Sequence, residues 1–86
     1  MLKVLIVNDD MTPMDFVADL LERVFEKSWE EATKIMLETH HEGQAVCGVY
    51  ADARARDLLS QATVLAEQSG YPLQFSLVDV DTGQPV

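Results

Sequence analysis

The sequence has little cysteine, few basic residues and no long apolar run. Its single cysteine, Cys47, has no partner within the chain for a disulfide, which indicates a reducing compartment. The first apolar run, residues 2–7, is too short for a signal peptide or a membrane span and leads directly into acidic residues. We therefore expect a cytoplasmic protein that has no membrane partner.

Positive charge is scarce. Six lysines and arginines stand against 15 acidic residues, which gives a formal net charge of −9. A surface of this sign repels nucleic acid and anionic lipid, so we expect neither as a partner, and it favours cationic ligands or basic partner surfaces. Solubility explains the acidity equally well, because a small domain with a large net charge resists association.

Length and composition describe one compact domain. The chain has 86 residues, of which 48% are hydrophobic and 24% charged, and these are the proportions of a globular protein with a single core. It contains no internal repeat and no low-complexity stretch. We expect residues 1–86 to form one domain, in which residues 79–86, rich in turn-forming side chains, are a flexible tail.

Hydrophobic spacing predicts three strands and three helices. Strands are expected where apolar residues run together or alternate, and helices where they recur every three or four positions. In chain order, the expected elements are a strand at 2–7, helices from 12 to about 27 and from 28 to about 42, a strand at 44–50, a helix from 52 to about 69 and a strand at 73–78. The order βααβαβ predicts an α+β fold of two layers, with three helices packed on one face of a three-stranded sheet. Small and β-branched side chains without a helical period favour a central place for the 44–50 strand, and its Gly48 lets another element approach closely.

Capping residues mark the expected helix ends. The sequence Thr12-Pro13-Met14-Asp15 predicts that the Thr12 hydroxyl caps the first helix. Ser28 and Glu31 form a full capping box for the second helix, and Gly43 predicts its end. Trp29 lies at helical spacing with the apolar residues that follow it, so we expect it on the buried face.

An acidic turn, Asn8-Asp9-Asp10, follows the first strand and is expected to meet His40 at the end of the second helix. Asn8 offers a carbonyl oxygen, the two aspartates offer negative charge, and a neutral His40 offers a ring nitrogen. These groups suit a protonated amine, such as the amino terminus of a peptide. We expect the affinity to fall as the pH drops through about 6.5, where a histidine side chain takes up a proton.

Apolar residues near this turn could form a pocket once the helices pack. They are Met14, Val17, Met36 and Leu73. Each feature also has a purely structural interpretation, because Asn and Asp shape turns, a histidine neutralises a helix dipole and methionine fills gaps in a core.

Other kinds of site fit the residues less well. An acidic turn after the first strand is typical of receiver domains, but those need about five βα units and an acid where Val49 and Tyr50 stand. His40 and His41 point roughly 100° apart on a helix, and no third histidine or paired cysteine completes a zinc site. Cys47 lies in the middle of a strand, where a buried thiol is inert. We expect no metal, no cofactor and no catalysis.

Several motifs occur together in the chain: Asn8-Asp9-Asp10, Thr12-Pro13-Met14, Met36 with His40, Gly43, and Cys47-Gly48-Val49. This combination, spread over residues 3–78, resembles the ClpS adaptor family of the bacterial N-degron pathway. The resemblance implies a non-enzymatic adaptor that binds the free α-amino group and the bulky first residue (Leu, Phe, Tyr or Trp) of a substrate. It also implies delivery to a AAA+ unfoldase, such as ClpA or ClpC, with its ClpP peptidase. The alternative is a domain that docks on such an unfoldase and modulates it without binding N-degrons.

The resemblance also implies roles for individual residues. Asn8, Asp9 and His40 match the residues that bind the α-amino group, and Met14 matches the gatekeeper that excludes β-branched first residues. The residues that match the pocket for the first side chain are Asp10, Thr12, Met14, Val17, Met36, Thr39 and Leu73.

Three features depart from the family pattern. Thr39 stands where the family usually has an aliphatic residue, which makes the pocket wall more polar, so we expect Thr39→Val to tighten the binding of aliphatic first residues. Residues 52–58 lack the Glu-rich pattern with a later lysine that the family commonly uses to dock on the unfoldase. Only Met1 and Leu2 precede the matched strand, whereas the family carries a flexible N-terminal extension. The preferred first residue and the choice of unfoldase therefore stay open.

Overall fold

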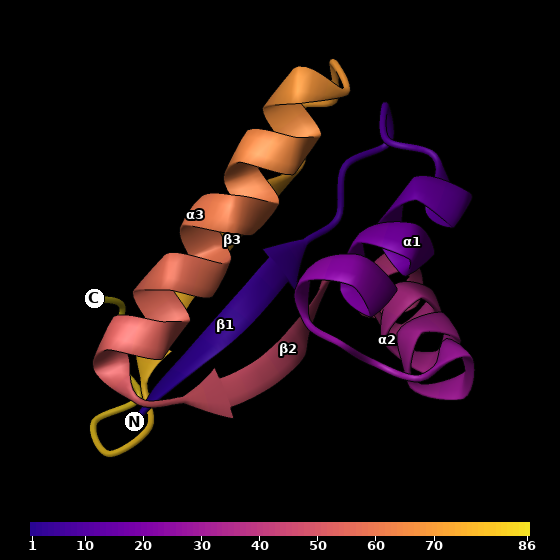
Figure 1. Ribbon diagram of the computed structural model, residues 1–86. Coiled ribbons are helices and arrows are strands. Elements are labelled where there is room, and N and C mark those ends of the chain that lie inside the picture. Colours follow the sequence, from indigo (N-terminus) through magenta and orange to yellow (C-terminus); the bar gives the residue numbers. More distant parts are fainter.

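The chain forms six elements in the predicted order. The computed structural model describes all 86 residues. Its elements are β1 (Leu2–Val7), α1 (Met14–Val24), α2 (Trp29–Glu42), β2 (Gln44–Tyr50), α3 (Asp52–Gln68) and β3 (Gln74–Asp79) (Figure 1). The βααβαβ order and the α+β class are confirmed. No helix has the length and apolar character needed to cross a lipid bilayer.

The sheet is antiparallel, with strand order β2-β1-β3. The prediction that residues 44–50 form the central strand was wrong, because β1 is central and β2 is an edge strand. β1 pairs with β2 on one side and with β3 on the other, and its alternate residues Leu2, Val4 and Ile6 are buried. The close neighbour of Gly48 is the phenol ring of Tyr50, which would have to move to make room for a Cβ at this position.

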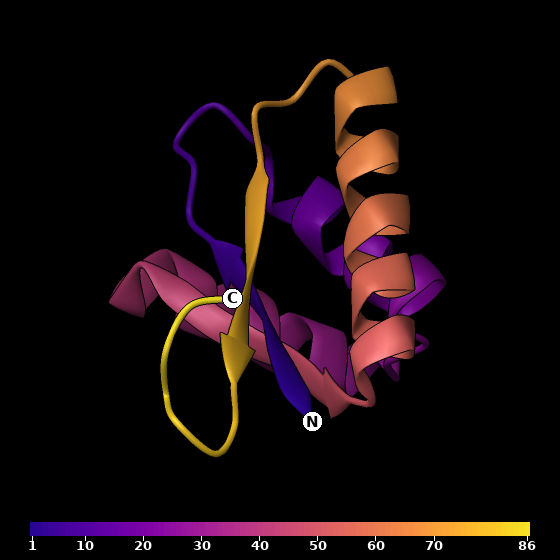
Figure 2. The same cartoon turned by 90° about the vertical axis from the view of Figure 1, so that its left-hand side faces the viewer.

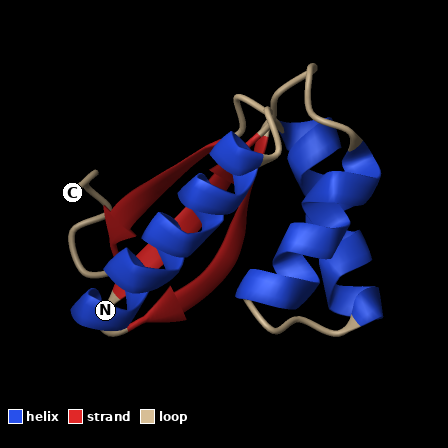
Figure 3. Cartoon of the chain, turned by 45° about the horizontal axis from the view of Figure 1, so that its top comes forward, coloured by secondary structure: helices blue, strands red, loops and turns tan.

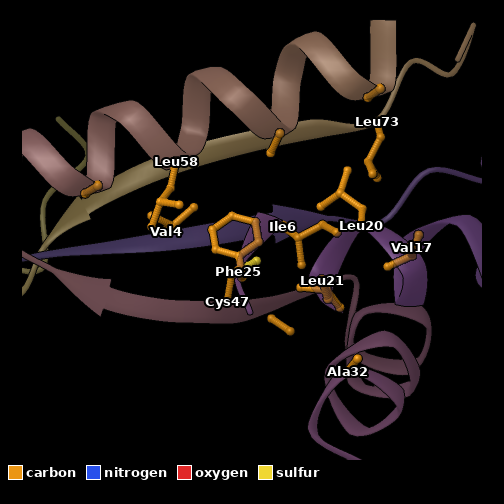
Figure 4. Packing of buried hydrophobic residues seen from close by; sticks show 14 of the residues in the cluster. Val4, Ile6, Val17, Leu20, Leu21, Phe25, Ala32, Cys47, Leu58 and Leu73 are labelled. Carbon is orange, nitrogen blue, oxygen red and sulfur yellow. The ribbon is translucent and has the colours of Figure 1, made fainter. Parts of the chain in front are cut away.

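The helices form the second layer. The long helix α3 lies along the sheet and contacts β3 and β1, α1 packs between α3 and α2, and α2 packs against β2 (Figures 2 and 3). The core between the layers is mainly aliphatic and includes Ile6, Leu20, Leu21 and Leu58, with the Phe25 ring and the Cys47 side chain among them (Figure 4). The expected packing of the helices on one face of the sheet is confirmed.

The ends of α2 follow the sequence prediction closely. The Ser28 hydroxyl accepts a hydrogen bond from the Glu31 N–H (3.1 Å), and the Glu31 carboxylate accepts one from the Ser28 N–H (3.2 Å). Gly43 ends the helix at φ +89°, and its N–H donates to the Thr39 carbonyl. Trp29, however, was wrongly predicted to be buried and is 67% exposed, because the apolar stripe of α2 reaches the core only from Ala32 onward.

The start of α1 also differs from the prediction. The helix begins at Met14, Pro13 occupies the N-cap position in an extended conformation, and no side chain caps the helix. The Thr12 hydroxyl instead donates to Asp9, so this residue belongs to the turn that precedes the helix.

The last residues fold back along β3. The Val86 N–H donates to the Leu77 carbonyl, the Asp79 N–H donates to the Gln84 carbonyl, and the Val80 N–H donates to the Met1 carbonyl. These bonds hold the turn in this arrangement, while the flexibility expected for residues 79–86 stays a prediction.

Candidate functional site

The turn after β1 is tied to the end of α2. The Asn8 N–H donates to the carbonyl of Gly43 over 2.8 Å, and the Thr12 N–H donates to the carbonyl of Asp9 over 3.1 Å. The first bond extends the β1–β2 pairing, whose last pair is Val7 with Gln44, by one residue. It therefore places the acidic turn beside the last turn of α2.

Side-chain hydrogen bonds orient the polar groups of the turn. The Thr12 hydroxyl donates to the Asp9 carboxylate at 2.6 Å, and the Asn8 amide nitrogen reaches the Asp10 carboxylate at 3.4 Å. Because its nitrogen points toward Asp10, Asn8 keeps its carbonyl oxygen free as an acceptor. The turn thus presents two carboxylates and an amide oxygen, which together suit a cation.

A cavity of about 250 Å³ lies between this turn, α1 and α2. Every residue predicted for the site lines it except Leu73, and Pro13 lines it as well. The lining residues are Asn8, Asp9, Asp10, Thr12, Pro13, Met14, Val17, Met36, Thr39 and His40.

Leu73 and Pro13 are the two differences from the predicted set. Leu73 is 5% exposed, lies near Leu20 in the core (Figure 4) and lines a neighbouring cavity beside α3 instead. Pro13 was not singled out from the sequence, although it stands inside the Thr12-Pro13-Met14 motif. Its extended backbone turns the chain into α1, which brings its ring to the cavity wall.

The wall of the cavity on the helix side is mainly apolar. Val17 is buried, Met36 is half-buried, and Met14 is 40% exposed. Thr39 is 2% exposed, and its hydroxyl donates to the Ile35 carbonyl at 2.8 Å. Because this bond directs the hydroxyl into α2, the wall is less polar than the threonine suggested from the sequence.

The polar side of the cavity combines the acidic turn with the end of α2. His40 is exposed and lines the cavity, whereas the adjacent His41 does not, and their rings meet edge to face with centroids 5.5 Å apart. The C-terminal end of a helix carries negative partial charge. The turn and the helix end therefore both favour a positive ligand beside an apolar cavity.

No group of three or more histidine, cysteine, aspartate or glutamate side chains is arranged to hold a metal ion. The Cys47 thiol lies away from the cavity, and burial raises its pKa to about 12. A thiol with this pKa stays protonated near neutral pH and is a poor nucleophile. The acceptors of the turn and the apolar helix wall suit a group that is cationic at one end and apolar at the other.

The sequence matches the family model of the ATP-dependent Clp protease adaptor protein ClpS over residues 1–76. The chain belongs to the ClpS family. The ATP-dependent Clp protease adapter protein ClpS of Rhodospirillum centenum is 49% identical over 77 residues, which are 90% of this chain and 71% of that protein. The ClpS of Gluconobacter oxydans is 47% identical over 77 residues, which are 90% of this chain and 65% of that protein. The predicted family is confirmed, and the protein is an adaptor of the Clp protease.

A solved ClpS structure has the same fold. Agrobacterium tumefaciens ClpS2 bound to L-phenylalaninamide superposes with a TM-score of 0.86 at 33% identity, over 99% of this chain and 95% of that chain. L-phenylalaninamide combines an amine with an apolar aromatic ring, and ClpS2 therefore holds a small ligand of the kind that the cavity described above suits.

Proposed function

We propose that this ClpS chain is a non-enzymatic adaptor that binds the free α-amino group and the bulky hydrophobic first residue of N-degron substrates. The observation that carries the proposal is the cavity itself, in which acceptors gather on the β1 turn and on the end of α2 while the helices supply an apolar wall. The phenylalaninamide bound by A. tumefaciens ClpS2 supports the same type of ligand.

The α-amino group is assigned to Asn8, Asp9 and His40. An ammonium group carries several N–H donors, and removing it from water is costly unless each donor finds an acceptor. The Asn8 oxygen, the Asp9 carboxylate and a neutral imidazole nitrogen of His40 supply such acceptors. Thr12 holds the Asp9 carboxylate in place through its 2.6 Å hydrogen bond.

The first side chain is assigned to the apolar part of the cavity. Val17, Met36 and Thr39 supply its wall, with Asp10 and Thr12 nearer the turn. A volume of about 250 Å³ suits Leu, Phe, Tyr and Trp, whereas small residues would leave much of it empty. Met14, which is partly exposed at the cavity, is assigned the gatekeeper role that the family resemblance implies, the exclusion of side chains that branch at Cβ.

Delivery to a AAA+ unfoldase, such as ClpA or ClpC with ClpP, completes the proposed role. The first turns of α3 carry two exposed ion pairs, Arg56 with Asp52 and Arg54 with Asp57, where the family commonly has a Glu-rich pattern. The proposed location is the cytoplasm, where the unpaired Cys47 would stay reduced. Because the protein has a net charge of −9, it repels nucleic acid and anionic membranes, and neither is a proposed partner.

Acetylating the peptide amine tests the proposal most directly. Binding of a fluorescent Phe-initiated peptide is measured with a free and an acetylated amino terminus. We expect acetylation to abolish measurable binding, because it removes the charge and two of the donors. Equal affinity of the two peptides would overturn the proposal, and unfoldase binding without any peptide response would favour the alternative role as a docking domain.

A pair of isosteric variants tests the assignment of the amine site. Asp9→Asn is expected to lower the affinity for a Phe-initiated peptide by about 10-fold to 100-fold, because a charge-assisted hydrogen bond is lost. Asp15→Asn is the matched control, since Asp15 is an exposed acid at the start of α1 that does not line the cavity. Similar losses in the two variants would show that only overall charge matters.

A peptide panel varied at its first residue tests the side-chain pocket. Leu, Phe, Tyr and Trp are expected to bind, and Val, Ile and Ala are expected to bind at least tenfold more weakly. Met14→Ala should recover binding of Val and Ile while it leaves the demand for a free amine intact. If the affinity did not depend on the first side chain, the cavity would not be the pocket that binds it.

A further inference from the structure

We propose that the site continues into a second compartment, the outer groove, which binds the second and third residues of the peptide. The outer groove is lined by Val7, Asn8, Asp9, Pro72 and Gln74 and has a volume of about 270 Å³. This inference rests on the proposed function, because the first residue of the same peptide must occupy the inner cavity.

Continuity with the inner cavity identifies the occupant of the outer groove. The two compartments share Asn8 and Asp9, so the residues assigned to the amine form the boundary between them. None of the other cavities shares a residue with the inner one. A peptide whose amine is held at this boundary therefore has the outer groove as the next hollow available to its chain.

The end of the β1–β3 ladder creates the outer groove. The pairing of these strands stops at Val7 with Gln74, and no backbone hydrogen bond joins the turn after β1 to the residues before β3. Pro72 has no N–H to continue the ladder. The segment after β1 and the segment before β3 separate here. The gap between them is open to solvent at Pro72 and Gln74, which are both exposed.

The side chains of the outer groove suit a peptide backbone. Gln74 makes no side-chain hydrogen bond within the protein, and the Asn8 oxygen is also free. A primary amide offers both donors and an acceptor, which is what a peptide N–H and C=O require. Val7 and Pro72 add apolar contact. We therefore expect recognition of the backbone more than of particular side chains at the second and third positions.

The reach of the chain fits two residues. An extended peptide advances about 3.3–3.6 Å per residue, so the second and third residues extend about 7 Å beyond the first. The outer groove is as large as the inner cavity that takes the first side chain. Pro72 and Gln74 also line the cavity beside α3, so a longer peptide has room to continue there.

The length dependence of binding tests the outer groove. The affinities of phenylalaninamide and of the tripeptide amide Phe-Ala-Ala-NH₂ are measured by calorimetry, and their ratio is compared between variants. For the unaltered protein we expect the tripeptide to bind about tenfold more tightly, equivalent to one or two hydrogen bonds. Because both ligands carry the same first residue, the ratio isolates the outer groove from the inner cavity.

Two matched variants locate the gain in affinity. Gln74→Trp fills the outer groove and is expected to bring the ratio to about one, and Gln74→Ala should lower it about threefold by removing the amide. Gln44→Trp is the control, because Gln44 pairs with Val7 from the opposite strand, is exposed and lines no cavity. It should keep the tenfold ratio.

The outcomes separate the inference from the proposed function. A ratio near one for the unaltered protein, or a tenfold ratio that survives in Gln74→Trp, would overturn the outer groove while leaving the inner cavity assigned. Failure of both ligands to bind would overturn the proposed function and the outer groove with it. Thermal melting of each variant confirms that the substitution leaves the fold intact.

Discussion

At the scale of the residue, Thr39 shows how a local hydrogen bond alters the character of a cavity. Its hydroxyl makes the wall look polar in the sequence, but the group is already bonded to the Ile35 carbonyl inside α2. A hydroxyl that is satisfied within its own helix has little effect on a neighbouring apolar ligand. The methyl group and the position of Thr39 then matter more than its polarity.

Thr39→Val is therefore expected to tighten the binding of a Leu-initiated peptide only slightly, by about twofold to threefold. The valine keeps the shape of the side chain and removes the hydroxyl, whose hydrogen bond adds only about 1 kcal/mol to stability. Titration of both variants with the same peptide measures the effect. A gain of tenfold or more would mean that the hydroxyl faces the ligand after all.

Cys47 makes the stability of the protein depend on pH in the alkaline range. Burial raises the pKa of its thiol to about 12, whereas an unfolded cysteine loses its proton near pH 8.5. Between these values the folded state keeps a proton that the unfolded state loses, so stability falls as the pH rises, by at most about 1.4 kcal/mol per pH unit. Below pH 8.5 this contribution is fully present.

Urea denaturation at pH 8 and pH 10 measures this dependence. From pH 8 to pH 10, we expect the unaltered protein to lose about 2 kcal/mol more of its free energy of unfolding than Cys47→Ala does. The comparison uses the change with pH, so the cavity created by the alanine cancels. Parallel losses in the two proteins would show that the thiol is accessible to solvent.

At the scale of the element, the sequence predicts those helix ends that short-range bonds define. Ser28 with Glu31, and Gly43 at a positive φ, behave as expected because each motif is complete within a few residues. Thr12 had two available partners, the start of α1 and Asp9. The shape of the turn decides between them, and that shape depends on the bond from Asn8 to Gly43.

Glu26, which follows α1, is in the left-handed region at φ +54°, the only residue other than glycine with a positive φ. A side chain in this region costs about 1–2 kcal/mol, part of which glycine regains. We expect Glu26→Gly to raise the free energy of unfolding by about 1 kcal/mol. The measurement is urea denaturation.

The same change within a helix provides the control for Glu26→Gly. Glu38→Gly, at an exposed position in α2, should lower the free energy of unfolding by about 1 kcal/mol, because the backbone there is right-handed. If both variants lost stability, the left-handed conformation of Glu26 would not be under strain.

At the scale of the whole molecule, the fold class was predictable, but the strand order was not. Periodicity reports which residues face a core, and β1, with alternate residues buried, and β2, with small and β-branched residues, both fit a sheet interior. Their order depends on which strands pair across distant segments of the chain, and β1 pairs with both β2 and β3. Most of the cavity was predicted from the sequence because its residues cluster in two short segments. Leu73 lies in a third segment, and its position depends on the path of that segment.

The net charge of −9 is expected to speed the capture of cationic peptides. A Phe-initiated peptide with two lysines should associate about tenfold more slowly at 0.15 M salt than at 0.01 M, because the Debye length falls from about 30 Å to about 8 Å. The same peptide with two glutamates should associate faster as salt rises. Stopped-flow fluorescence measures both, and equal responses would exclude long-range attraction.

The bond between Asn8 and Gly43 places the site in line with the central strand. A mechanical pull on a bound peptide would enter the protein at the residue that follows β1. Because β1 is bonded to β2 on one edge and to β3 on the other, such a load would run parallel to two rows of hydrogen bonds and strain them together. The contacts proposed to hold the peptide amine are fewer than the hydrogen bonds in those two rows. We therefore expect tension to release the bound peptide while the adaptor stays folded and able to bind a second peptide.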